Sequence, residues 1–240
     1  MLSWQHLTAA VLNLTVTGAT IFSLAVGASA APAFYSGAEI RGWVVDAETK
    51  QPLEGVHVVA QWRLNTGLIH GEHVTRLQIL ETVTDARGEY YLPPWGPKPR
   101  PFLSVLEWGF DPILTFFKPG YRPDGRDNYG PPPDNEGEMS LRFSVWHGKT
   151  VALEPFRGTA KDWAIHLSGL QTAIGWGHET DGAVRRVNDY WKHMPRMVLA
   201  VFEQCRLVPR SLSYRVRDLN AWHVTEAELR ALIKEGGTAP

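Results

Sequence analysis

The residue types best suited to chemistry are two histidines in one short stretch, His70-Gly-Glu-His73. Two imidazoles three residues apart, with Glu72 between them, are ligands that zinc and copper accept. A third ligand would have to come from elsewhere in the chain, and isolated loop histidines are more often solvated. A metal-dependent envelope enzyme that uses His70 and His73 is therefore an alternative hypothesis and not the favoured one.

A second motif, His223-Val-Thr-Glu226, has the spacing of a zinc peptidase motif. No histidine follows it to complete a ligand set, and it coincides with the expected start of a helix. The chain also lacks the G-x-S-x-G pattern of a nucleophile elbow. We therefore expect no catalytic residues and no cofactor.

Aromatic rings are abundant, with ten tryptophans, and several lie near expected strand ends and loops. Flat rings at such places stack on sugars or grip a partner peptide, whereas packing in the core is their more common role. A carbohydrate-binding module is thus a further alternative. The candidate ligand-binding rings are Trp95, Trp108, Tyr121 and Tyr129. Trp146 lies near a strand end as well, and packing in the sandwich is the simpler interpretation for Trp108 and Trp146.

Acidic residues gather in the loop that follows Tyr121. They lack the spacing of an EF-hand, so a solvated loop is a better interpretation than a calcium site. The acids are Asp124, Asp127, Asp134, Glu136 and Glu138.

The elements that must position these residues are strands in the first half of the chain. Short apolar segments from Ala38 to about Phe156 are separated by Gly, Pro and Asp. Residues 54–62, EGVHVVAQW, alternate with a period of two, which is typical of a strand. Because no helices are expected between these segments, the pattern predicts an antiparallel sandwich or barrel.

A tight turn joins two of the expected strands at Asp85-Ala-Arg-Gly88. Asp85 can accept backbone hydrogen bonds across the turn, and Gly88 can adopt a positive φ. We therefore expect Asp85 and Gly88 to be structural turn residues and not a working site.

The second half of the chain has the period of helices. We expect one helix from about Thr159 to Gly175, a second from Asp181 to about Leu207 with a kink at Pro195, and a third after Thr225. Cys205 falls on the apolar stripe of the second helix, so the sequence predicts a buried and unreactive thiol.

The N-terminus is an apolar run without charge, residues 7–30, which ends in Ala28-Ser29-Ala30. This ending indicates that residues 1–31 are an export signal that is cleaved. Residues 7–30 are also long enough to span a bilayer, so a retained membrane anchor is the alternative. The net charge of −1 argues against a nucleic-acid partner. We expect an exported protein, periplasmic or at the cell surface, whose only membrane contact is this segment if it is retained.

Three blocks of sequence, IRGWVVDAETKQPLEGVHVVAQW, TVTDARGEYYLPPWG and FFKPGY, resemble the carboxypeptidase regulatory-like domain. That family has a transthyretin-like, carbohydrate-binding-like β-sandwich fold and contributes no catalytic residues. The resemblance covers about Ile40 to Tyr121 and implies nothing about the helical end of the chain.

Together these observations predict a mainly β protein with α-helices. An antiparallel transthyretin-like β-sandwich is expected over residues 38–157, followed by a helical C-terminal region over residues 158–240. The expected function is an exported, non-catalytic module for binding or assembly in the cell envelope, with an envelope protein or a glycan as partner.

Overall fold

The computed structural model describes residues 32–65, 74–101, 105–106, 111–129, 140–175, 178–181, 184–187 and 189–236. The described residues belong to one compact unit, Pro32–Pro240. The expected export signal and His70 and His73 lie outside the described residues. Within the described ranges, no helix has the length and apolar character that crossing a bilayer requires.

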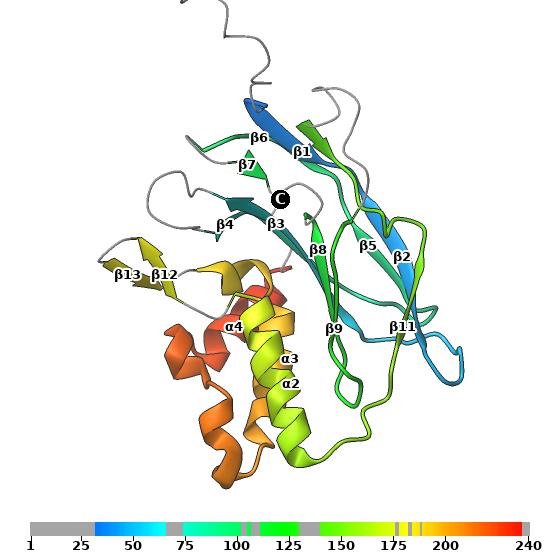
Figure 1. Ribbon diagram of the computed structural model, residues 1–240, viewed down its shortest axis with the longest axis vertical. Coiled ribbons are helices and arrows are strands. Elements are labelled where there is room, and N and C mark those ends of the chain that lie inside the picture. The colour runs from blue at the N-terminus through cyan, green and yellow to red at the C-terminus, as the bar shows by residue number, and fades with distance from the viewer. Residues whose placement is uncertain are drawn as a thin grey trace, which may run out of the picture. The chain divides into compact units, whose positions relative to one another are not determined.

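One layer of the sandwich consists of two adjoining three-stranded sheets, in the orders β10–β1–β6 and β11–β2–β5. Strands β1 and β2 follow each other along this layer, and β5 and β6 run antiparallel beside them (Figure 1). The strands are β1 (Phe34–Gly37), β2 (Ile40–Asp46), β5 (Glu89–Leu92), β6 (Trp95–Pro99), β10 (Leu141–Arg142) and β11 (Thr150–Leu153).

The facing layer is a single sheet in the order β4–β3–β8–β9, with β7 paired to the end of β3. Its strands are β3 (His57–Asn65), β4 (Val74–Val83), β7 (Val105–Leu106), β8 (Ile113–Phe117) and β9 (Asp124–Arg126). The pairings within this sheet are antiparallel. The β-sandwich expected from the sequence is confirmed.

The alternation in β3 decides which side chains enter the sandwich core. Val58, Ala60 and Trp62 are buried between the two layers, together with residues of β2, β5, β8 and β11. Val59 points the other way and is buried against the helices. Both faces of β3 are therefore covered, and a polar side chain of the helix-facing side, Gln61, is buried as well.

Two pairings differ from the antiparallel expectation, because β10 runs parallel to β1 and β11 runs parallel to β2. The chain reaches β10 from β9, which belongs to the other layer. A strand that returns from the opposite sheet is free to arrive in either direction, whereas a hairpin forces an antiparallel pair.

Helices cover the outer face of the β4–β3–β8–β9 sheet, so the described residues form three layers (Figure 1). Thr159 begins α2 (Ala160–Ala173) with a capping box to Asp162, and Thr225 begins α4 (Glu226–Lys234) with a capping box to Glu228. Both helices were expected at these places. The remaining elements are η1 (Tyr190–His193), α3 (Pro195–Arg206), η2 (Arg210–Arg215) and η3 (Leu219–Trp222).

The helix expected from Asp181 to Leu207 is wrong in its first half. Strands β12 (His178–Asp181) and β13 (Val184–Val187) form an antiparallel pair there, and the helix α3 begins only at Pro195. Proline lacks the N–H that the first turn of a helix leaves unpaired, so Pro195 starts the helix and does not kink it.

The thiol of Cys205 lies in the core between the sheet and the helices, as expected. It accepts a hydrogen bond from Nε2 of Gln171 at 3.3 Å, and burial raises the pKa of the thiol to about 12. The thiolate form is therefore strongly disfavoured near neutral pH.

Candidate functional site

The histidine pair proposed as a metal site, His70 and His73, lies outside the described residues, as does Trp108. Among the residues that the structure does describe, no three His, Cys, Asp or Glu side chains converge as metal ligands would. The metal hypothesis for His70 and His73 stays a prediction.

Trp95 is part of the sandwich core and only 9% of it is exposed. Its ring lies 5.1 Å from that of Trp62 in an edge-on arrangement. The faces of the Trp95 ring therefore pack against protein and are not available to a sugar unless the core opens.

Tyr121 and Tyr129 lie nearer the surface. The hydroxyl of Tyr121 donates a 2.9 Å hydrogen bond to Oδ2 of Asp46. The pKa of Asp46 is lowered, chiefly by the hydrogen bond from the backbone N–H of Thr49 and also by the one from Tyr121. Tyr129 is 66% exposed. Tyr121 thus ties the start of the β9 segment to the end of β2, while Tyr129 presents its ring at the surface.

Trp146 is half-buried and its indole Nε1 donates to the carbonyl of Asp127 at 2.9 Å. The guanidinium of Arg126 stands over the same ring, 5.0 Å from its centre. A cation above an aromatic face is attracted by the ring quadrupole. The ring of Trp146 thereby helps to position Arg126.

The Asp85 carboxylate lies within a hairpin turn. Its Oδ1 accepts 2.9 Å hydrogen bonds from the N–H groups of Arg87 and Glu89, and Gly88 has φ 71°. The hydrogen bond from Glu89 is the largest cause of the lowered pKa of Asp85. These contacts lie within the turn, which is how a structural aspartate behaves.

The glutamate of the His223-Val-Thr-Glu226 motif lies in a group of surface ion pairs. Glu226 pairs with Arg206 at 2.9 Å and with Arg230 at 2.7 Å. The hydrogen bond from Arg230 is the first cause of the lowered pKa of Glu226. The motif therefore belongs to the start of α4 and its surface ion pairs.

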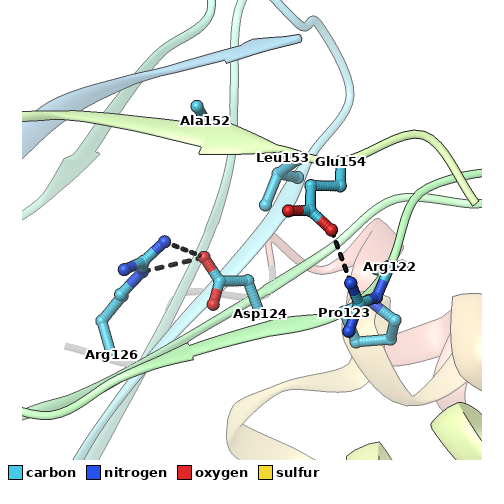
Figure 2. Close-up of a pocket in the computed structure, with 7 residues that line it drawn as sticks. All are labelled: Arg122, Pro123, Asp124, Arg126, Ala152, Leu153 and Glu154. Atoms are coloured by element: carbon cyan, nitrogen blue, oxygen red, sulfur yellow. Dashed lines mark hydrogen bonds and ion pairs between the residues drawn. The ribbon is translucent and has the colours of Figure 1, made fainter. Parts of the chain in front are cut away.

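A charged groove lies between the edge strands β9 and β11 (Figure 2). Arg122, Asp124 and Arg126 alternate along one side, and Ala152 and Glu154 lie on the other. Two ion pairs line the groove: Arg122 with Glu154 at 2.5 Å, and Arg126 with Asp124 at 2.6 Å. Its volume of about 180 Å³ is small, so it does not enclose a molecule of ordinary ligand size.

The groove continues into a wider hollow of about 540 Å³ that reaches the start of α2 and shares Arg122 and Glu154 with it. Arg157 and Glu48 form an ion pair of 2.6 Å in this hollow. Hydrogen bonding to Glu48 raises the pKa of Arg157, and hydrogen bonding to Thr159 lowers that of Asp162. These groups are held in their charged forms, which suits recognition of charge more than proton transfer.

Strand β11 presents an open edge beside the groove. On its inner side it pairs with β2, where Lys149 and Leu153 accept hydrogen bonds from Trp43 and Ala47. Thr150 and Ala152 alternate with these residues, so their backbone groups point away from β2. Just beyond the strand, the carbonyl of Glu154 also points that way and accepts from Arg122 N–H at 2.9 Å. In the described part of the chain no further hydrogen bond is recorded on this outer edge of β11.

The groove could not be predicted from the sequence, because Arg122 and Glu154 are 32 residues apart and only the fold brings them together. Asp124 and Asp127 were expected only as acids of a solvated loop. The alternation of Arg122, Asp124 and Arg126 was a visible signal, since residues two apart on a strand share a face.

Comparison with known proteins gives weak similarities to solved structures. No family model and no curated protein matches the chain. The group B streptococcus pilus 2b backbone protein is 15% identical with a TM-score of 0.25, over 50% of this chain and 41% of that one. The C-terminal domain of the shaft pilin SpaA from Lactobacillus rhamnosus GG is 12% identical with a TM-score of 0.24, over 52% and 100% of the chains.

A dioxygenase domain from the cellulolytic bacterium Streptomyces sp. SirexAA-E is 18% identical, with a TM-score of 0.29, over 55% of this chain and 86% of that one. With TM-scores this low, none of the three similarities assigns a function to this chain. The resemblance to the carboxypeptidase regulatory-like domain stays a prediction. The structure itself establishes a β-sandwich whose inner sheet carries a helical C-terminal region.

Proposed function

We propose that this chain is an exported, non-catalytic β-sandwich module that binds an extended segment of another envelope protein along the groove between β9 and β11. The observation that carries the proposal is the open edge of β11 beside a row of alternating charges. An extended peptide that pairs with an exposed edge gains backbone hydrogen bonds, and side-chain contacts then select its sequence.

The charges that line the groove support a polar partner segment. Arg122 and Glu154 are both more than half exposed, and ion pairs between such side chains are worth about 0–1 kcal/mol. A partner with charges of both signs therefore exchanges these pairs for its own at little cost. An apolar partner would desolvate these charges without offering them any polar contact in return.

Export and the absence of catalysis are part of the proposal. Export rests on the apolar run of residues 7–30 and its Ala-Ser-Ala ending. The non-catalytic role rests on the resemblance to the carboxypeptidase regulatory-like domain and on the charged states of the groups in the hollow beside the groove.

Site-directed cross-linking tests the proposal. The native thiol, Cys205, is buried, so an introduced cysteine can be labelled selectively. We expect an Ala152→Cys variant carrying a photoreactive group to yield one dominant adduct in intact envelopes. An Ala227→Cys variant, labelled on the exposed face of α4, is the matched control. Equal patterns of adducts from the two positions would count against a binding edge at β11.

A further inference from the structure

Residues 206–217, RLVPRSLSYRVR, form a basic surface segment, which we call the arginine segment. It contains four arginines and no acidic residue, although the whole chain has 24 Lys and Arg against 25 Asp and Glu. Arg206 pairs with Glu226 at 2.9 Å. Within the described ranges, the other three arginines, Arg210, Arg215 and Arg217, form no ion pair. Positive charge is thus concentrated at one place in a chain of nearly zero net charge.

The arginine segment also exposes large apolar side chains. Leu207 is 72% exposed and Tyr214 is 74% exposed. The guanidinium of Arg215 lies 5.0 Å from the centre of the Tyr214 ring. The 3-10 helix η2 inside this segment has no buried residue. Apolar and cationic groups therefore share one solvent-facing element.

The segment is held in place from the core side. Gln171 on α2 is 2% exposed, and its Nε2 donates to the carbonyl of Arg217 at 2.9 Å. Its Oε1 accepts from the N–H of Arg217 at 3.1 Å. A buried amide that bonds both backbone groups of one residue fixes the end of the segment. The exposed side chains are therefore presented from an anchored backbone.

We infer that the arginine segment docks on the surface of a lipid bilayer with anionic headgroups. Arginines near such a surface are attracted to it, and apolar side chains beside them enter the boundary between headgroups and acyl chains. An acidic polymer would account for the arginines but leave Leu207 and Tyr214 without a role. The inference goes beyond the proposed binding edge, because the arginine segment shares no residue with the groove.

A fluorescent reporter inside the segment tests the inference. A Ser211→Cys variant of the full chain carries an environment-sensitive dye, and Cys205 is too buried to compete for it. We expect the emission to shift to the blue with vesicles of phosphatidylcholine and phosphatidylglycerol in equal parts, and to stay unchanged with phosphatidylcholine alone. Because the reporter senses its own surroundings, the N-terminal segment does not contribute to the signal.

Variants separate the two contributions. In the dyed protein, Arg210→Gln with Arg217→Gln lowers the vesicle affinity about fivefold per arginine, and added salt lowers it further. Leu207→Ala with Tyr214→Ala abolishes the blue shift even where binding persists. Arg87→Gln removes an arginine from the β4–β5 turn and is the matched control, with unchanged affinity.

Several results would overturn the inference. These are no blue shift with anionic vesicles, an equal shift with phosphatidylcholine alone, or the same shift with polyglutamate or inorganic phosphate. The same dye attached at Pro93→Cys, between β5 and β6, must show no blue shift with anionic vesicles. A shift there equal to that at Ser211→Cys would mean that the whole protein adsorbs without using the arginine segment. The cross-linking from Ala152→Cys does not depend on vesicle binding. A negative result with vesicles therefore refutes this inference and leaves the proposed binding edge at β11 untouched.

Discussion

The backbone N–H of Met197 donates a 2.5 Å hydrogen bond to Oε1 of Glu81, although the two residues are 116 positions apart. The other carboxylate oxygen, Oε2, accepts from the N–H of Arg196 at 3.1 Å. Met194, the N-cap residue just before α3, provides no side-chain hydrogen bond to the helix. A carboxylate on β4 therefore caps the helix and joins the helical region to the sandwich.

The pKa of Glu81 follows from this position. Burial raises the pKa to about 7, against the opposing effect of the Met197 and Arg196 N–H groups. His57, on the same face of the sheet, has its pKa lowered to about 4 by burial and by the charges of Arg196 and Lys118. Near one end of α3, the pKa of Glu81 is thus raised and that of His57 is lowered.

These shifts predict opposite pH dependences of the unfolding free energy. The raised pKa of Glu81 gives stability that is present below pH 4.5 and lost as pH rises through 7. The lowered pKa of His57 gives stability that is present above pH 6.5 and lost as pH falls through 4. Urea unfolding should therefore show rising stability between pH 4.5 and 6.5 for Glu81→Gln, and falling stability for His57→Gln. Parallel profiles for the two variants would contradict this assignment.

The ion pair between Asp111 and Arg142 is buried, with side chains 0% and 4% exposed and 3.0 Å between Oδ2 and Nε. Arg142→Leu removes the opposite charge that the buried carboxylate of Asp111 pairs with at Oδ2, so we expect a loss of about 3–5 kcal/mol in the free energy of unfolding. The double variant Arg142→Leu, Asp111→Leu should lose less. Chemical denaturation measures both, and a double variant no more stable than Arg142→Leu alone would disprove the assignment.

Gly88 sits in the turn with φ 71°, and an added Cβ would lie 2.4 Å from the carbonyl oxygen of Val44. Gly88→Ala should cost about 1–3 kcal/mol of stability, because the backbone is in the left-handed region and the contact is with main chain. Gly120→Ala is the control: it also has positive φ, but nothing lies near its Cβ position. Equal losses in both variants would show that the close contact at Gly88 is unimportant.

Cys205 should resist thiol reagents in the folded protein, because burial raises its pKa to about 12. The expected result is negligible modification in native buffer and one equivalent after denaturation in guanidinium chloride. Cys205→Ala removes the signal in both conditions and serves as the control. Rapid labelling of the native chain would contradict the burial of this side chain.

Features governed by neighbouring residues were predictable from the sequence. The alternation in β3, the turn at Asp85 to Gly88, the helix start near Thr159 and the capping box at Thr225 depend on residues within one element. The region from Asp181 to Pro195 has a helical pattern in the sequence, because Val184 and Val187 are spaced as on a helix face. A short apolar run fits either period, so the β12–β13 pair could not be distinguished.

Features that depend on pairing between segments far apart in the sequence were not predictable. The parallel pairs β1–β10 and β2–β11 join strands more than a hundred residues apart, and no local pattern indicates their direction. The groove between β9 and β11 exists only because of such pairing. The cap that Glu81 provides for α3 also joins two distant segments. The sequence of α3 by itself therefore gives no sign of it.

The most direct test of the binding edge removes one backbone donor. The N–H of Ala152 points away from β2, so Ala152→Pro eliminates it while the bonds of Val151 and Leu153 to β2 remain. With a photoreactive label at Thr150→Cys, the account predicts that Ala152→Pro lowers the envelope adduct at least tenfold and that Ala152→Ser leaves it unchanged. Equal adduct yields from the proline and serine variants, both folded, would contradict strand addition at β11.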